Sequence, residues 1–174
     1  MHEYVNRIAH DAVRLERLLP GPLERAWSFL TESDKRARWL AAGEWELRPG
    51  GRIEMIFEHD RLQSEPTPEK YRDMPMSFTG KVLRIEAPRL IEFTWMETNG
   101  VASEVTFELS ERGDKVALII THRKVDGRDM LLSVSGGWDV HVGILEDVLA
   151  NREPRGFWSN HARLEREYAQ RYGV

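Results

Sequence analysis

Two histidines stand where an acid–base pair could form. His122 ends a predicted strand that begins at Val116, on the side that carries the strand's apolar residues. His141 lies beside Trp138 on the apolar stripe of a predicted helix. If that helix packs on the sheet, both imidazoles reach one cavity, where they could move protons to and from a bound carbonyl compound. The alternative is that each is a hydrogen-bonded histidine at a cavity rim or helix flank, and on this balance we assign no catalytic residue.

Aromatic side chains form the second group of candidates. Many of them alternate along predicted strands or lie on predicted helices, and such a lining suits an apolar or aromatic ligand. The alternative at any single position is that the ring only fills the core of a curved sheet. Together with the two histidines, the predicted ligand-binding residues are Trp39, Phe57, Phe78, Phe93, Trp95, Phe107, His122, Trp138 and His141.

Other kinds of chemistry lack their usual sequence signals. The chain has no cysteine, which excludes disulfides, thiolate-held metals and a cysteine nucleophile. It has no HExxH motif and no histidine pair four residues apart, so we expect no metal site. GxGxxG, P-loop and GxSxG motifs are also missing, and we expect no cofactor.

Charge and hydropathy narrow the partners and the location. The 25 Lys and Arg residues against 29 Asp and Glu residues give a net charge of −4, which argues against a nucleic-acid partner. No run approaches the roughly 20 apolar residues of a membrane span. With no apolar signal region near the N-terminus, we expect a cytoplasmic protein.

The first two thirds of the chain read mostly as strands. Pro22 is placed to begin a first short helix, and Ser33 to cap a second that carries Trp39 and Leu40. Residues 59–75, with Pro66, Pro68 and Pro75, read as a long loop. Alternating apolar residues and turn signals predict strands at residues 12–19, 45–47, 53–57, 76–86, 91–95, 101–109 and 116–122.

The last third reads as helical. Asp129 is placed to cap a helix over residues 130–150, and its Gly136-Gly137 pair suggests close approach to another backbone. A further helix covers residues 157–172, and its apolar stripe must pack on the cavity mouth, the sheet or a second copy. If exposed, a stripe with Trp158 and Tyr168 would be a homodimer contact.

These elements predict one α+β domain over all 174 residues. A curved antiparallel sheet of about seven strands would wrap around the one long helix, with two short helices after the first strand. The space between sheet and long helix is the natural place for a cavity.

Several short motifs resemble the SRPBCC (START-like) superfamily. They are the run from Leu19 to Trp27, Trp39-Leu40, Gly50-Gly51-Arg52, the stretch from Gly80 to Trp95, and Gly137-Trp138. Their order is similar to the branch that contains the C-terminal domain of the activator of the heat-shock-protein-90 ATPase. The resemblance covers about residues 13–150 and leaves residues 151–174 as a helical extension. It implies a helix-grip fold with a hydrophobic cavity, and it does not imply one activity.

Three functions follow as hypotheses. The first is binding of a small hydrophobic molecule between sheet and long helix, with entry controlled by the short helices and the 59–75 loop. The second is an enzyme of cyclase or dehydratase type that uses His122, His141 or an acid such as Glu54. The third is a co-chaperone-like module, which needs an exposed apolar patch and a chaperone partner. We expect a binding protein rather than an enzyme.

Overall fold

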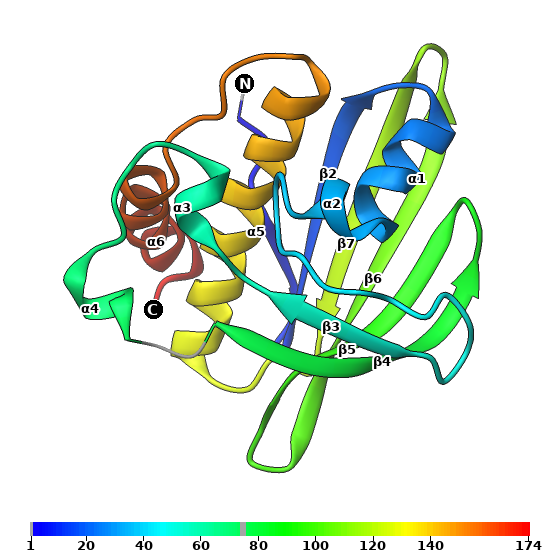
Figure 1. The fold of residues 1–174 in the computed structure, drawn as a ribbon. Helices are drawn as coiled ribbons and strands as arrows, with labels where there is room; N and C mark the ends of the chain where they lie inside the picture. The colour runs from blue at the N-terminus through cyan, green and yellow to red at the C-terminus, as the bar shows by residue number, and fades with distance from the viewer. Residues whose placement is uncertain (1, 74–75) are drawn as a thin grey trace.

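Alternating apolar residues build one curved antiparallel sheet, seen in the computed structural model, which describes residues 2–73 and 76–174 (Figure 1). In this described part the sheet has seven strands in the order β1-β2-β7-β6-β5-β4-β3. The strands are β1 (Asn6–Ala9), β2 (Ala12–Pro20), β3 (Arg52–Ile56), β4 (Ser77–Glu86), β5 (Leu90–Thr98), β6 (Val101–Arg112) and β7 (Lys115–Arg123).

One long helix, α5 (Arg128–Leu149), lies across the concave face of the sheet, and α6 (Phe157–Tyr172) packs against α5 (Figure 1). The helices α1 (Leu23–Thr31) and α2 (Ser33–Arg36) cover one end of the sheet. Two further short helices, α3 (His59–Leu62) and α4 (Glu69–Arg72), lie in the segment predicted as a loop. This arrangement confirms the predicted α+β fold with a gripped helix.

The strand register decides which side chains face α5. Phe93 on β5 pairs with Val105 on β6, and Val105 pairs in turn with His122 on β7. Side chains of paired residues share one face of a sheet, so His122 belongs to the same apolar row as Phe93. The side chains of this row are buried in the core: Phe93 and Val105 are 0% exposed.

Several local predictions differ from the structure. Trp39 and Leu40 lie beyond the end of α2, and Ser33 does not cap that helix, because its hydroxyl accepts a hydrogen bond from the Gly43 N–H. Gly127, not Asp129, precedes the first residue of α5. Pro75 lies outside the described residues.

In the part of the chain that the structure describes, the sheet has the predicted number of strands, but one predicted strand is absent and one strand was not predicted. Residues 45–47 form no strand: Trp45 makes only an isolated bridge to Ile53. The short edge strand β1 was not predicted, because Asn6–Ala9 is exposed along its whole length and carries no buried alternation.

A buried carboxylate joins the N-terminal segment and α6 to α5. Asp139 on α5 accepts hydrogen bonds from the Tyr168 hydroxyl at 2.5 Å and from Arg17 at 3.0 Å. The same tyrosine oxygen accepts the Val5 N–H at 2.7 Å. Burial beside Asp139 raises the pKa of Tyr168, so this hydroxyl keeps its proton. The apolar stripe of α6 therefore packs against other parts of the same chain, and its Tyr168 is 0% exposed.

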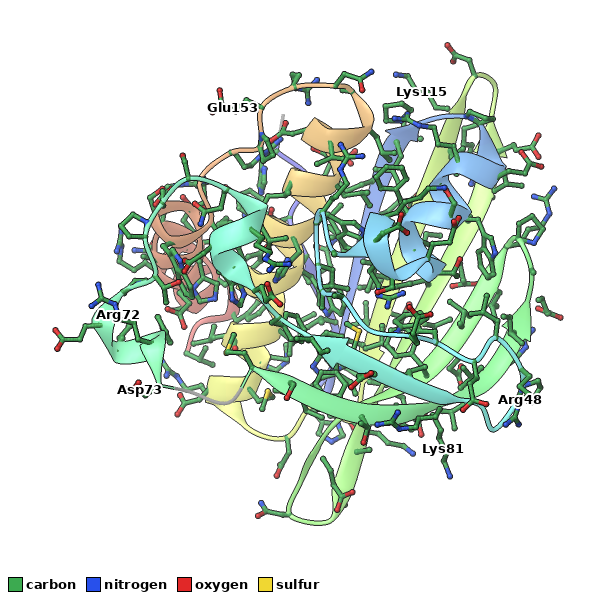
Figure 2. All side chains as sticks on the ribbon, in the orientation of Figure 1. Arg48, Arg72, Asp73, Lys81, Lys115 and Glu153 are labelled. Carbon is green, nitrogen blue, oxygen red and sulfur yellow. The ribbon has the colours of Figure 1, made fainter. Side chains whose placement is uncertain are left out.

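Charged side chains project from the outside of the molecule. Figure 2 shows Arg48, Arg72, Lys81, Lys115 and Glu153 around its rim. Within the described residues, no helix is long and apolar enough to cross a membrane.

Candidate functional site

An apolar cavity of about 290 Å³ lies where β5, α5, α6 and the segment around α3 and α4 meet. The middle of the space between sheet and α5 is filled by core side chains, so the cavity sits toward α6 instead. The described residues that line it are Leu40, Phe57, His59, Tyr71, Met76, Trp95, Met96, Met130, Ser133, Val134, Gly137, Trp138, His141, Phe157, Trp158, His161 and Glu165.

His122 is held rigidly behind the cavity wall. Its Nδ1 atom accepts the Trp138 indole N–H at 3.0 Å, so its proton resides on Nε2, which donates to the Ser103 hydroxyl at 2.8 Å. Burial lowers the pKa of His122 to about 3. With both nitrogens engaged, this side chain orients Trp138 and does not offer a free base.

His141 does line the cavity, and its tautomer is also fixed. Its Nδ1–H donates to the Trp39 carbonyl at 2.7 Å, which leaves Nε2 as an acceptor. Burial, together with the neighbouring His59, lowers the pKa of His141 to about 3. The imidazole is therefore neutral at pH 7 and presents a lone pair.

Two further histidines reach the same cavity, and neither was among the predicted site residues. The His59 ring lies 5.7 Å from the ring of His141 and 4.5 Å from that of Phe157, measured between centroids. Burial lowers the pKa of His59 to about 4. His161 stacks on Phe157 at 5.6 Å, and burial lowers its pKa as well, although Glu165 opposes the effect.

The outer wall of the cavity is an aromatic pair from two distant parts of the chain. The ring of Tyr71 on α4 stacks on Trp158 of α6 at 4.9 Å with an interplanar angle of 15°. The Trp158 indole nitrogen is buried and has no hydrogen-bond partner among the described residues. An unpaired buried donor is costly, so this N–H is a candidate contact for a ligand oxygen.

The glycine pair of α5 has two separate roles. A Cβ at Gly136 would lie 3.8 Å from the Glu165 backbone nitrogen, which agrees with the predicted close approach to another backbone. A Cβ at Gly137 would meet no described atom within 4 Å beyond its own stretch of helix, and Gly137 lines the cavity. The missing side chain of Gly137 thus leaves part of the cavity open.

The segment with α3 and α4 also holds the start of α6. Glu65 accepts hydrogen bonds from the Ser159 N–H at 2.9 Å and the Ser159 hydroxyl at 2.7 Å. Gln63 accepts the Phe157 N–H at 3.1 Å. These contacts satisfy N–H groups that the first turn of a helix leaves free. A Cβ at Gly156 would overlap the Glu65 carboxylate, so glycine is required for this approach.

The nine predicted ligand-binding residues fall into two places. Four line the cavity: Phe57, Trp95, Trp138 and His141. The other five lie behind this lining: Trp39, Phe93 and Phe107 are 0% exposed in the core, His122 is 1% exposed, and Phe78 packs on Phe57 and Trp95. Which of the nine residues touch a ligand stays a prediction.

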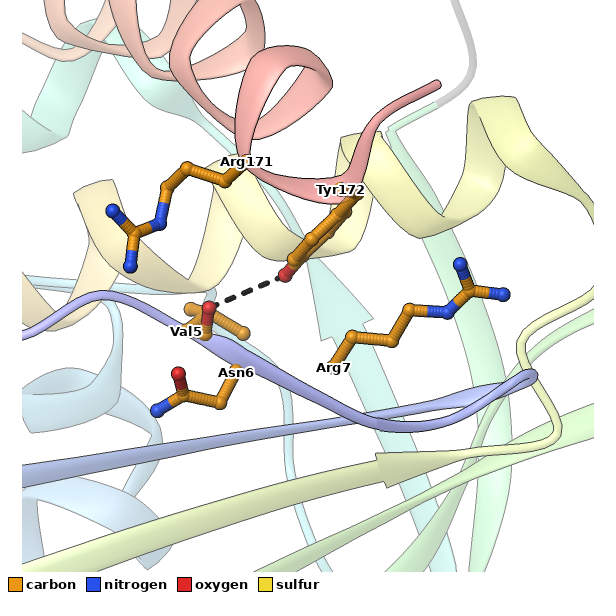
Figure 3. A pocket seen from close by; sticks show the side chains of 5 residues that line it. All are labelled: Val5, Asn6, Arg7, Arg171 and Tyr172. Atoms are coloured by element: carbon orange, nitrogen blue, oxygen red, sulfur yellow. Dashed lines mark hydrogen bonds between the residues drawn. The ribbon is translucent and has the colours of Figure 1, made fainter.

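A second hollow, of about 540 Å³, lies between β1 and the end of α6 (Figure 3). It is lined by Val5, Asn6, Arg7, Arg171 and Tyr172. Three of its polar side chains are already hydrogen-bonded within the chain: the Tyr172 hydroxyl donates to the Val5 carbonyl at 3.3 Å, Arg7 donates to the carbonyls of Ala9 and His10, and Asn6 donates to the Tyr4 carbonyl. The Arg171 guanidinium instead lies over the Tyr4 ring, 3.9 Å from its centroid. The aromatic cavity is therefore the stronger candidate site.

Metal coordination finds no support in the described part of the chain, where no three His, Asp or Glu side chains are placed to hold an ion. The three cavity histidines lie around Phe157 rather than around one point. Their arrangement provides hydrogen-bonding atoms in an apolar wall.

Comparison with known proteins gives relatives of known structure. The solution structure of the protein encoded by gene BPP1335 of Bordetella parapertussis has 43% identity and a TM-score of 0.82, covering 95% of this chain and 88% of that one. The crystal structure of CalU16 from Micromonospora echinospora has 22% identity and a TM-score of 0.68, covering 91% and 86%. The latter likeness concerns the fold alone.

Comparison of the sequence with family models assigns the chain to a family. No curated protein matches the chain. The family model of the activator of Hsp90 ATPase homolog 1-like proteins matches residues 20–150, which is most of the region where the motifs were found. The chain therefore belongs to this family of activator of Hsp90 ATPase homolog 1-like proteins, within the SRPBCC-type fold.

Proposed function

We propose that the chain binds a small hydrophobic molecule in the cavity between β5, α5, α6 and the segment of α3 and α4. The observation that carries the proposal is Gly137, which keeps space open inside a wall of aromatic rings. Glycine in a helix interior costs about 1 kcal/mol relative to alanine, and at this position no described neighbour requires it. A ligand that occupies the space would explain why glycine stands at this position despite its cost to the helix.

The lining supports the same proposal. Trp95, Trp138, Phe157 and Trp158 offer large apolar surfaces, while the polar atoms are few. This combination is typical of small-molecule sites, in which apolar walls supply affinity and a few polar groups set orientation. The Tyr71–Trp158 pair is placed to control entry, because both rings line the cavity and also a neighbouring surface hollow that Arg61 and Arg72 help to line.

Filling the cavity tests the proposal. In Gly137→Leu the new side chain would occupy the open space, and the better helix propensity of leucine should keep the fold intact. Asp129→Leu is the matched control, since it adds leucine to the same helix at a side chain that is 96% exposed. Each freshly purified protein is examined by native mass spectrometry and then titrated with apolar fragments in a thermal-shift assay.

We expect a bound molecule, or a fragment that raises the melting temperature, in the wild type and in Asp129→Leu but not in Gly137→Leu. If the wild type carries no molecule and no fragment raises its melting temperature, the proposal fails. It also fails if Gly137→Leu binds as well as the wild type.

A second candidate is an enzyme of cyclase or dehydratase type. The observation in its favour is that His59, His141, His161 and Glu165 line the same cavity. The lowered pKa values of His59 and His141 keep both imidazoles neutral at pH 7, so they would enter such a reaction in the unprotonated form. The test is whether a molecule recovered from the protein is chemically changed when it is incubated with the wild type but not with His141→Phe. Recovery of the molecule unchanged in both cases contradicts this candidate.

A further inference from the structure

The cavity holds one hydrogen-bond acceptor whose orientation is fixed by the fold. The Trp39 carbonyl takes the Nδ1 proton of His141 at 2.7 Å, so the neutral imidazole keeps a lone pair on Nε2. No partner for Nε2 is found in residues 2–73 and 76–174. The His141 side chain is 5% exposed and lines the cavity, so its Nε2 is free to accept a hydrogen bond from a bound molecule.

A hydrogen-bond donor, the Trp158 indole N–H, lies in the same aromatic cluster. The Trp158 N–H is buried without a partner among the described residues. The ring of His59 packs near both, with its centroid 5.7 Å from that of His141 and 5.0 Å from that of Trp158. The cavity thus offers an acceptor and a donor within one aromatic cluster, and a ligand hydroxyl group can pair with either, because its oxygen both donates and accepts.

The charges around the cavity argue against an anionic ligand. The charged side chain among the described lining residues is Glu165, and no lysine or arginine is among them. The histidines would have to take up protons to balance a carboxylate, and burial opposes this. An anion would therefore lose its hydration without gaining a counter-charge.

We propose that His141 selects an uncharged aromatic molecule that carries a hydroxyl group, which donates its proton to Nε2. The inference rests on the proposed function, because it takes the cavity as the binding site. The volume of about 290 Å³ is at the small end of the roughly 300–1,000 Å³ found for ligand pockets. It fits a molecule of the size of a two-ring aromatic rather than a long-chain lipid.

Three probes of similar shape separate the possibilities: 1-naphthol, 1-methylnaphthalene and 1-naphthoate. Their dissociation constants are measured by calorimetry at pH 7 with the wild type and with His141→Phe. We expect the preference for 1-naphthol over 1-methylnaphthalene to fall about tenfold in His141→Phe, the loss that a hydrogen bond to a buried acceptor predicts. Naphthoate should bind the wild type at least about tenfold more weakly than naphthol.

Because His141→Phe also removes the bond to Trp39, a second measurement uses the wild type alone. In protein labelled with ¹⁵N-histidine, the His141 Nε2 resonance should shift with 1-naphthol and stay in place with 1-methylnaphthalene.

The outcomes distinguish the role of His141 from the role of the cavity as a binding site. An unchanged preference in His141→Phe, an equal Nε2 shift with both neutral probes, or tightest binding of naphthoate overturns the role of His141 while leaving the cavity as a binding site. If none of the three probes binds the wild type, this inference fails, whereas the proposed function fails only if the mass spectrometry and the fragment titration also find no bound molecule.

Discussion

At the residue scale, the buried histidines make stability depend on pH. Burial lowers the pKa of His122 and His141 to about 3, against about 6.5 in an unfolded chain. The unfolded state therefore binds more protons below pH 6.5, so the stabilisation is complete above that pH and is lost as the pH falls toward 3. Each histidine should cost about 2 kcal/mol of unfolding free energy between pH 7 and pH 5.

Urea unfolding at pH 7, 6 and 5 checks this prediction. In His122→Gln the loss of stability on acidification should be smaller than in the wild type by about one histidine's share. His10→Gln is the control, because it makes the same substitution at a side chain that is 89% exposed. Equal pH dependence in wild type and His122→Gln would show that His122 is not held neutral by the fold.

Residue types alone predicted only part of the site. His122 and His141 could be placed near the core, because each lies on a periodic apolar face. His59 has no such signal, because it lies in a proline-rich segment. His161 lies on the apolar stripe of its helix, but that helix is outside the family pattern. Their convergence on Phe157 depends on how two distant segments pack, which local periodicity does not encode.

At the element scale, the segment with α3 and α4 and the helix α6 stabilise each other. Both lie outside the clearest family motifs, yet Glu65 of one binds the first turn of the other. A carboxylate at a helix N-terminus is favourable because it pairs with free N–H groups and with the helix dipole. The predicted stripe of α6 was correct, but its packing partner could not be read from the stripe itself.

Removing the Glu65 carboxylate tests this dependence. Glu65→Ala should lower the free energy of unfolding by about 1 kcal/mol, the usual value of a helix cap. Amide hydrogen exchange at Phe157 and Ser159 should accelerate, because the start of α6 opens more easily. Glu69→Ala, which removes an exposed carboxylate from the first turn of α4, is the control. Unchanged exchange at Ser159 in Glu65→Ala would contradict the mutual stabilisation.

At the scale of the whole molecule, the fold was predictable because most local signals agreed with it. Alternation, hairpin turns and one long apolar helix all indicate a sheet that wraps a helix, and the structure has that form. The position of the cavity was less predictable. Trp39, Phe93 and Phe107 fill the centre of the grip, so the open space lies at its edge, where α6 and the α3–α4 segment complete the wall.

The six tryptophans provide the most direct test of that account. Trp95, Trp138 and Trp158 line the cavity, whereas Trp27 and Trp45 are not among its described lining residues. Their indole N–H signals can be followed separately by ¹H–¹⁵N NMR while 1-naphthol is added. We predict the largest shift at Trp158, whose N–H gains a partner, with smaller shifts at Trp95 and Trp138 and none at Trp27 or Trp45. Shifts spread evenly over all six signals, or confined to Trp27 and Trp45, would contradict the cavity as the binding site.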